Sequence, residues 1–315
     1  MIDFQGATFS YGDGADPVLN AVTFTIAPGE RVVLAGPNGC GKTTLLKHMN
    51  ALLLPTTGDV SIDGLNTRDR RHAPEIRRRV GMVFQNPDHQ IVGTTVEEDV
   101  AFGPGNLGLP PEEIRRRVAE ALAAVRLDTL RQRPPQTLSG GEKRLLAVAG
   151  ALAMEPRYLV LDEPTAYLDP AGRRRVVEVL ARLHGEGIAV VQVSHDLDDI
   201  LDAGRLLIMA GGEIRADGPP RAVLSRPDAL ESIGLDLPPV VRLLERLRRE
   251  GVKLPADALT VEEAARALHA LIAVRGPDGA GTGRSPCPSP EAGKGGPADA
   301  TADGTDGGRT RGGPS

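Results

Sequence analysis

The sequence predicts an α/β fold in which a parallel sheet carries helices on both faces. Three short apolar runs, typical of buried parallel strands, occupy residues 31–36, 158–163 and 188–195. Between the last two runs, residues 171–187 have the apolar period of one amphipathic helix, which a glycine ends. The stretch from 97 to 155 contains no such run and has helical periodicity, which predicts a helical lobe inserted at about residues 86–155.

An antiparallel β subdomain is predicted at the N-terminus. Residues 22–26 (VTFTI) alternate apolar and polar side chains, as a half-buried strand does, and Pro28 with Gly29 predicts the turn that follows. The first domain, which contains this subdomain, the parallel sheet and the helical lobe, is predicted to cover residues 1–218.

A small helical appendage is predicted at residues 219–275. Two short amphipathic helices occupy residues 237–251 and 260–274, and Thr260 and Glu263 have the spacing of a capping box. Their leucines need an apolar partner, which is either a dimer contact or the chain's own first domain. These leucines are Leu243, Leu244, Leu247, Leu268 and Leu271.

The last 40 residues, 276–315, differ sharply in composition. They include 12 Gly and 6 Pro and contain no Leu, Ile, Val, Phe or Met. Such a segment cannot bury enough apolar surface to offset the entropy that ordering would cost. We therefore predict a disordered tail.

Composition limits the classes of function. The chain has 315 residues, of which 40% are hydrophobic, and its formal net charge of −5 argues against a surface that coats nucleic acid. Two cysteines without metal-binding spacing fit a reducing cytosol. We find no secretion signal, and no apolar run approaches the 18 or so residues that span a bilayer. If the protein works at a membrane, we expect another chain to span it.

A phosphate-binding loop is predicted directly after the first apolar run. The segment GPNGCGKTT matches the pattern G-x-x-x-x-G-K-[ST], which predicts a P-loop NTPase. We expect its parallel sheet to be RecA-like. The backbone N–H groups of the loop can surround a phosphate, Lys42 can reach the β- and γ-phosphates, and the Thr43 hydroxyl can bind Mg²⁺. The candidate nucleotide-binding residues are Gly36, Pro37, Asn38, Gly39, Cys40, Gly41, Lys42, Thr43 and Thr44.

Cys40 stands where such loops more often have Ser, Ala or Gly. A thiol at a helix N-terminus beside Lys42 is expected to favour the thiolate form. We therefore expect alkylation of Cys40 to block nucleotide binding.

Polar side chains at the ends of three further apolar runs complete a candidate catalytic site. Asp162 can hold Mg²⁺, and Glu163 is the candidate that polarises the attacking water. His195 ends the next run, where a neutral imidazole can hydrogen-bond the γ-phosphate. Gln85 follows a fourth run and can reach the metal or the water.

The segment LSGGE predicts a second anion site. Ser139 is a good N-cap, whereas Gly140 and Gly141 each cost about 1 kcal/mol in a helix interior relative to alanine. Glycines at a helix start let a ligand approach the backbone closely, and a helix N-terminus favours anions.

Together these motifs resemble the nucleotide-binding subunit of an ABC transporter. The resemblance covers about residues 2–218 and rests on GPNGCGKT, Gln85, LSGGE, LVLDEP and His195 in this order. It implies an ABC-type ATPase that uses ATP and Mg²⁺. It also implies that two ATPase subunits close on two shared ATP molecules and that hydrolysis opens them.

The resemblance assigns roles to further residues. Ser139, Gly140, Gly141 and Glu142 would face the γ-phosphate of the ATP held by the partner subunit, and Asp169 matches the loop that crosses the dimer interface. Tyr11 matches the aromatic residue that stacks on adenine, and Tyr167 departs from the small residue common at its position.

A narrower resemblance links the chain to the ATPases of energy-coupling factor importers, including cobalt importer ATPases. It rests on residues 83–109, on LSGGEKR and most specifically on the C-terminal segment 237–268. It implies three kinds of partner: a second ATPase subunit of the same or a paralogous chain, a transmembrane coupling protein, and a membrane-embedded binder for a vitamin, cobalt or nickel. It implies a peripheral position at the cytoplasmic face of the membrane and no nucleic-acid partner.

An acidic stretch after Gln85 is a candidate contact for the membrane partner. Asn86, Pro87 and Asp88 predict a short helix, and Gln90, Glu97, Glu98 and Asp99 extend the polar stretch. We expect it to hold a basic helix of the coupling protein, and the alternative is a merely solvated acidic face.

The alternative function is a soluble ABC ATPase that acts in Fe–S assembly or on DNA. The 126 positions between Gly36 and Asp162 leave no room for the long coiled coil that separates these motifs in some DNA-associated members.

Overall fold

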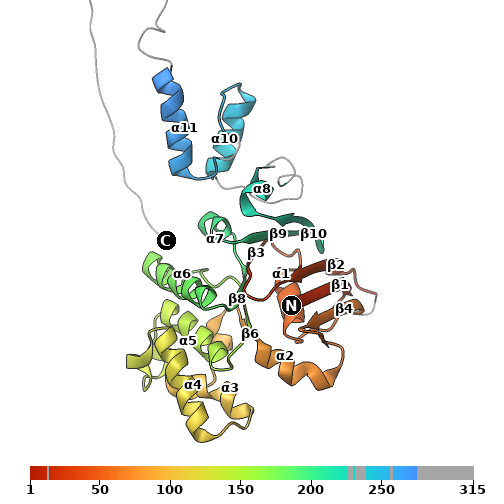
Figure 1. Ribbon diagram of the computed structural model, residues 1–315, viewed down its shortest axis with the longest axis vertical. Helices are drawn as coiled ribbons and strands as arrows, with labels where there is room; N and C mark the ends of the chain where they lie inside the picture. Colours follow the sequence, from red (N-terminus) through yellow and green to blue (C-terminus); the bar gives the residue numbers. More distant parts are fainter. Residues whose placement is uncertain (13, 226–229, 231–238, 256–257, 275–315) are drawn as a thin grey trace, which may run out of the picture. The chain divides into compact units, whose positions relative to one another are not determined.

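The computed structural model describes residues 1–12, 14–225, 230, 239–255 and 258–274, shown in Figure 1. Its strands are β1 (Ile2–Phe9), β2 (Leu19–Ile26), β3 (Arg31–Ala35), β4 (Thr57–Ile62), β5 (Leu65–Asn66), β6 (Val80–Val83), β7 (Tyr158–Leu161), β8 (Ala189–Val193), β9 (Arg205–Ala210) and β10 (Glu213–Gly218). Its helices are α1 (Lys42–Met49), α2 (Ala73–Arg79), α3 (Val96–Asn106), α4 (Pro111–Ala124), α5 (Gly140–Leu152), α6 (Pro170–Gly185), α7 (Leu197–Leu201), α8 (Pro220–Leu224), α10 (Pro239–Arg249) and α11 (Val261–Val274).

The N-terminal strands form an antiparallel sheet in the order β2-β1-β4-β5. Ile2 on β1 pairs with Ile26 on one side and with Ile62 on the other, and all three side chains are buried. The antiparallel subdomain predicted at the N-terminus is confirmed. The sequence pattern did not indicate β4 and β5, which join this sheet from beyond the first helix.

The second sheet has six strands in the order β10-β9-β3-β8-β7-β6. Neighbouring strands from β9 to β6 are parallel, and β10 pairs antiparallel with β9 at one edge. The three apolar runs predicted as parallel strands are β3, β8 and β7, which lie side by side. Because parallel strands end at the same edge of a sheet, the residues that follow β3, β6, β7 and β8 are brought together.

The core divides along the two faces of this parallel sheet. Val32 and Leu34 of β3 pack towards α1 and the antiparallel sheet, whereas Val33 and Ala35 pack towards α7 and α8. This alternation follows from the two-residue period of a strand. Helices α3 to α6 cover the rest of the face that carries α7 and α8, where their apolar side chains meet those of β6, β7 and β8.

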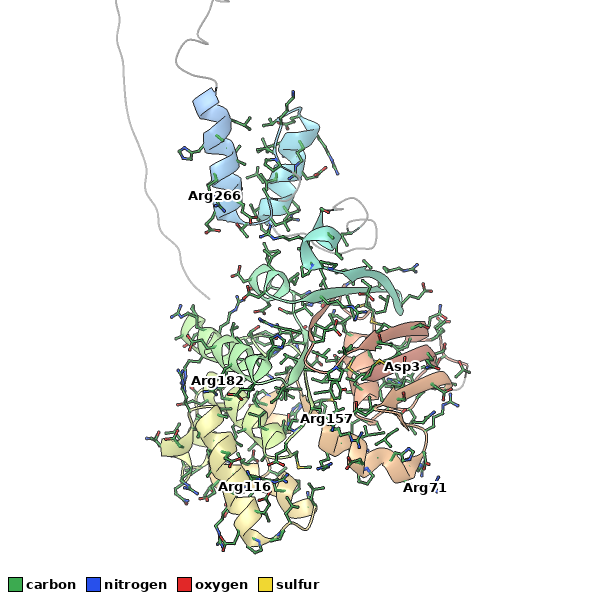
Figure 2. All side chains as sticks on the ribbon, viewed as in Figure 1. Asp3, Arg71, Arg116, Arg157, Arg182 and Arg266 are labelled. Atoms are coloured by element: carbon green, nitrogen blue, oxygen red, sulfur yellow. The ribbon has the colours of Figure 1, made fainter. Side chains whose placement is uncertain are left out.

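The inserted helical lobe consists of α3, α4 and α5, which lie together beside α6 in Figure 1. Its surface carries ion pairs, as on α4, where Arg116 contacts Glu113, Glu120 and Glu155 (Figure 2). Where the lobe joins the sheet, the Gln90 amide bonds to Met82 O and Phe84 N–H, as a neighbouring strand would. The side chain thereby pairs the free edge of β6.

Helix α10 packs partly on the chain's own sheet domain. Val241 belongs to the same buried cluster as Val33 and Ile208, whereas Leu243 is 51% exposed. The predicted capping box at the start of α11 is confirmed, because Thr260 and Glu263 exchange backbone-to-side-chain hydrogen bonds of 3.2 Å.

Residues Met1–Ala270 form one compact unit, and the second unit begins at Leu271. The structure describes the second unit only as far as Val274, so the predicted disordered tail lies outside the described residues. The predicted division at residue 218 stays a prediction. In the part of the chain that the structure describes, every helix is too short or too polar to serve as a membrane span.

Candidate active site

The phosphate loop connects β3 to α1, and two glycines fix its path. At Gly36 a Cβ atom would lie 2.0 Å from the Met209 carbonyl oxygen, so no side chain fits. Gly41 caps α1 with φ of +107°, and a Cβ there would lie 2.8 Å from the Val18 carbonyl oxygen. The sequence therefore needs glycine at both positions to bring the loop back to the helix start.

Lys42 and Thr43 open α1 beside the first acidic residue. Lys42 Nζ donates to the carbonyls of Gly36 and Pro37 at 2.7 and 2.8 Å. The Thr43 hydroxyl donates to Asp162 Oδ2 at 2.7 Å. Asp162 is 4% exposed, and burial raises the pKa of its carboxyl above the usual value despite this hydrogen bond. A buried carboxylate beside a hydroxyl is a set of hard oxygen donors that suits Mg²⁺.

Glu163 receives contacts from two other strand ends. Gln85 Nε2 donates to Glu163 Oε2 at 2.9 Å, and His195 Nε2 lies 3.6 Å from Glu163 Oε1. Burial and the charge of Lys42 lower the pKa of His195, so its imidazole is neutral near pH 7. The Glu163 backbone has φ of +48°, a conformation that costs energy for a residue with a side chain and that concentrates at functional sites.

Ten of the predicted site residues line a cleft of 530 Å³ at the end of the parallel strands, whereas Gly36, Pro37 and Cys40 of the phosphate loop do not. Those that line it are Tyr11, Asn38, Gly39, Gly41, Lys42, Thr43, Thr44, Gln85, Asp162 and Glu163. Glu163 also lines an adjoining hollow of 290 Å³ together with His195. The cleft and hollow thus meet at the residue that sequence analysis predicts as the group that polarises water.

Two tyrosines border the cleft. The Tyr11 ring is 62% exposed, and its hydroxyl lies 2.9 Å from the Thr44 hydroxyl. Tyr167, the residue that departs from the usual small one, is 96% exposed and has φ of +61°. Its ring therefore packs on almost nothing in the described part of the chain.

The LSGGE segment starts α5 with a complete capping box. The Ser139 hydroxyl accepts the Glu142 N–H, and Glu142 accepts the Ser139 N–H at 2.8 Å. The backbone hydrogen bond from Ser139 lowers the pKa of the Glu142 carboxyl. A Cβ at Gly141 would lie 3.1 Å from the Gly172 Cα, so this glycine allows α5 and α6 to approach closely. That close approach is one use of the Gly-Gly pair that the sequence pattern did not reveal.

None of the residues from Ser139 to Glu142 lines the 530 Å³ cleft of the same chain. Asp169, also outside it, is the N-cap of α6 and accepts the Gly172 N–H at 2.6 Å. The starts of α5 and α6 are therefore both fixed by hydrogen bonds to their own capping side chains.

Comparison with known proteins identifies the family. The ABC transporter family profile matches residues 19–166. The cobalt import ATP-binding protein CbiO of Syntrophus aciditrophicus is 54% identical over 270 residues, which cover 86% of this chain and 96% of that relative. The chain belongs to the ABC transporter family, as an ATP-binding subunit.

Two further comparisons narrow the group. The energy-coupling factor transporter ATP-binding protein EcfA1 of Symbiobacterium thermophilum is 52% identical over 275 residues, 85% of this chain and 96% of that protein. The structure of cbiO1 from Clostridium perfringens, part of the ABC transporter complex cbiONQ, matches with a TM-score of 0.67 at 34% identity, covering 78% of this chain and 98% of that one.

The energy-coupling factor resemblance and the ABC ATPase fold are therefore confirmed. Members of this family are ATPases coupled to transport, and this chain is one of them. The comparisons do not favour the alternative of a soluble ABC ATPase.

The expectation of a thiolate at Cys40 of this ABC ATPase is wrong. Cys40 is 9% exposed, and burial raises the pKa of its thiol more than the nearby charge of Lys42 lowers it. The sequence placed the thiol correctly at the helix start, but it did not show that the side chain points into the core.

The acidic stretch after Gln85 is less free than its composition indicated. The predicted short helix is present as a 3₁₀ turn, Pro87–His89, capped by Asn86. Asp99, however, is 9% exposed and accepts the N–H groups of Val92 and Gly93 at 2.7 and 2.9 Å. Asp99 therefore shapes this loop and does not offer its charge to a partner.

Sequence reasoning missed two buried groups that hold the site. Asp199 is 2% exposed and accepts the Ser194 hydroxyl at 2.7 Å, beside the ion pair between Arg173 and Asp196. These contacts fix the segment that carries His195. Arg144 is similarly buried and bonds to the segment that carries Gln85. Arg144 has no local sequence signal, because its partners lie about 60 positions away in the chain, and Asp199 is only five positions from Ser194 but belongs to no motif that the sequence analysis used.

Proposed function

We propose that this ABC ATPase binds ATP with Mg²⁺ in the 530 Å³ cleft and hydrolyses it with Glu163 as the group that polarises water. The observation that carries this proposal is the convergence of Gln85 and His195 on the two carboxylate oxygens of Glu163. A carboxylate fixed by a neutral amide donor is oriented without losing its charge, which suits a general base.

The phosphate loop and Asp162 would provide the phosphate and metal sites. Lys42 would turn from the carbonyls of Gly36 and Pro37 towards the β- and γ-phosphates, within reach of the same loop. Thr43, Asp162 and Gln85 would hold Mg²⁺, since a magnesium ion bound mainly by phosphates and water needs few protein oxygens. When bound, the ion would neutralise charge on the phosphates.

Tyr11 would stack on the adenine ring. Its exposed ring stands at the cleft, and the Thr44 hydroxyl holds its hydroxyl group. Stacking of a base on an aromatic side chain contributes about 1–3 kcal/mol.

A second ATPase subunit, the same chain or a paralogue, would complete the site. Ser139 to Glu142 start a helix whose capping box leaves the remaining first-turn N–H groups for an anion, and they lie outside the cleft of their own chain. They would face the γ-phosphate of the ATP in the partner's cleft, with the loop at Asp169 crossing the interface.

The ATPase pair would drive a transmembrane coupling protein that works with a membrane-embedded substrate binder. The name of one relative, a cobalt import ATP-binding protein, supports cobalt as the imported substrate, and the energy-coupling factor resemblance adds nickel or a vitamin as the alternatives. The chain would lie at the cytoplasmic face of the membrane as a peripheral subunit, without a nucleic-acid partner.

The coupling protein would dock where α3 and the loop before it expose apolar side chains. Val92 is 59% and Phe102 is 56% exposed, and Glu97 and Glu98 lie between them in the chain. Apolar anchors with an acidic rim suit an amphipathic basic helix.

Affinity purification tests the proposal. The tagged full-length Glu163→Gln variant would be purified with ATP from detergent-solubilised membranes, with Lys42→Ala as the variant that should not hold ATP. Recovery of a polytopic membrane protein with a small membrane partner, dependent on Lys42, supports the proposal. Recovery of the ATPase alone from both variants would contradict it.

A further inference from the structure

We propose that Arg144 is a positioning residue that couples the partner-facing start of α5 to Gln85, and through Gln85 to Glu163. The inference rests on the proposed function, because it uses the roles proposed for Ser139, Gln85 and Glu163. It adds a physical connection between the surface that serves the partner's ATP and the base that serves the chain's own ATP.

The guanidinium of Arg144 holds two successive carbonyls. Nη1 donates to Phe84 O at 2.5 Å, and Nη2 donates to Gln85 O at 2.6 Å. These carbonyls follow β6, the edge strand of the sheet, so no neighbouring strand occupies that side. A planar guanidinium with parallel donors fixes both the position and the orientation of the peptide between them.

Burying the Arg144 guanidinium beside the end of β6 has an energetic cost. Its side chain is 2% exposed, its Nε has no hydrogen-bond partner, and among the described residues no carboxylate lies within ion-pair distance of it. Burial lowers the pKa of the guanidinium, and the charges of Asp162 and Glu163 act in the opposite direction. Since a buried charge without a carboxylate partner destabilises a fold, stability alone does not explain the residue.

The connection continues in both directions from Arg144. Ser139, Glu142 and Arg144 belong to the first two turns of one helix, which move together because the capping box closes the helix start. On the other side, the Gln85 side chain donates to Glu163 Oε2 at 2.9 Å. A displacement of the start of α5 would therefore move the Gln85 backbone and change its contact with Glu163.

A second, weaker link runs parallel to the first. Lys143, the residue before Arg144, bonds through Nζ to Asp88 Oδ1 at 2.7 Å in the same segment. Asp88 is more exposed than Arg144, and exposed ion pairs contribute little to stability. Arg144 therefore dominates the attachment.

The first test compares Arg144→Lys and Arg144→Met in the full chain with Arg115→Met, which alters an exposed arginine on α4 of the same lobe. Lysine keeps the charge but cannot hold both carbonyls in a fixed fork. We expect both Arg144 variants to lose turnover by about 10- to 100-fold, as misplaced catalytic groups do, while the affinity for a fluorescent ATP analogue stays within about threefold. Arg115→Met should retain turnover and affinity. Loss of affinity in parallel with turnover in the folded Arg144→Lys protein would overturn the proposal.

A double-mutant cycle separates positioning from general damage. Gln85→Ala should lower turnover, and Arg144→Lys in that background should add less than about a threefold further loss, because both changes break one connection. Multiplicative losses would overturn the coupling, and so would full turnover in Gln85→Ala. The ATPase proposal is judged separately by Glu163→Gln, so the two failures are distinguishable.

Hydrogen exchange tests the attachment itself without turnover. In Arg144→Lys the amides of residues 85–91 should exchange at least about tenfold faster than in the native chain, since their segment loses its fixed contact with α5. Arg115→Met should leave them unchanged. Unchanged exchange in Arg144→Lys would overturn the proposal.

Discussion

Gln85 donates its side-chain amide to Glu163 across the ends of two neighbouring parallel strands, with 2.9 Å between Nε2 and Oε2. The contact follows from the register of β6 and β7, which pairs Val83 with Leu161. Gln85 stands two positions after Val83, and Glu163 stands two positions after Leu161. The pairing of the two strands therefore sets the separation of Gln85 and Glu163. Whatever moves the segment after β6 therefore acts on Glu163.

Replacing the buried acid Asp162 should stabilise the protein without nucleotide. Burial raises the folded-state pKa of this carboxyl, so at pH 7 its charge destabilises the native state relative to the unfolded one. Asp162→Asn should raise the thermal midpoint at pH 7 by a few degrees, since about 1 kcal/mol corresponds to roughly 2–4 °C in a domain of this size.

The difference in thermal midpoint between Asp162→Asn and the native chain should shrink as the pH falls through the raised folded-state pKa of Asp162. Below the usual pKa of 3.8 the carboxyl is neutral in both the folded and the unfolded state. Thermal unfolding in a chelator measures both effects. An equal or lower midpoint for Asp162→Asn at pH 7 would count against this explanation.

Cys40 should react slowly with a maleimide. The thiol is buried and its pKa is raised, so little thiolate exists at pH 7 and the rate should rise as the pH is increased. In a Cys287→Ser background we expect labelling at least about tenfold slower than in the unfolded chain. Mass spectrometry after timed labelling measures this, and equal rates in folded and unfolded protein would show that the thiol is accessible.

The three acids of α3 should behave differently. Asp99→Ala should lower the free energy of unfolding by about 1–3 kcal/mol, because the N–H groups of Val92 and Gly93 lose their acceptor. Reversal of Glu97 and Glu98 to Lys should leave the ATPase activity of the isolated subunit intact and lower transport. Denaturant unfolding measures the effect of Asp99→Ala, and uptake by the reconstituted complex measures the effect of the Glu97 and Glu98 reversal. Unchanged transport would favour a merely solvated face at Glu97 and Glu98.

Neighbouring apolar residues on α10 distinguish packing from dimer contact. Val241 is 1% exposed and packs with the sheet domain, so Val241→Asp should lower stability by about 3 kcal/mol or more. Leu243 is 51% exposed, and Leu243→Asp should retain stability while weakening self-association if α10 contributes to the dimer. Thermal unfolding and analytical ultracentrifugation measure the two properties, and unchanged association would leave α10 with an intrachain role.

Local pattern was enough to predict much of the fold. The strand before Gly36 and the helix from Lys42 are contiguous with the phosphate loop, and an acid at the end of an apolar run lies at a strand end. The sequence likewise predicted the cap at Ser139, because capping depends on neighbours within one turn.

Other features depend on distant partners and leave no local trace. The pairing of β4 with β1 joins residues about 50 to 60 positions apart, and Arg144 meets Gln85 across 59 positions. The positive φ of Glu163 and the burial of Cys40 follow from the tertiary structure around them, which overrides local preference. The roles assigned to the individual site residues stay predictions.

Phosphate release by purified Glu163→Gln, measured beside the native chain and with ATP affinity on the same samples, tests directly whether Glu163 is the base. The amide is nearly isosteric and can still contact Gln85, but it cannot accept a proton from water. We expect turnover to fall by about 10²-fold or more while ATP still binds and holds the subunits together. Turnover within a few-fold of the native rate would contradict the assignment of Glu163 as the base.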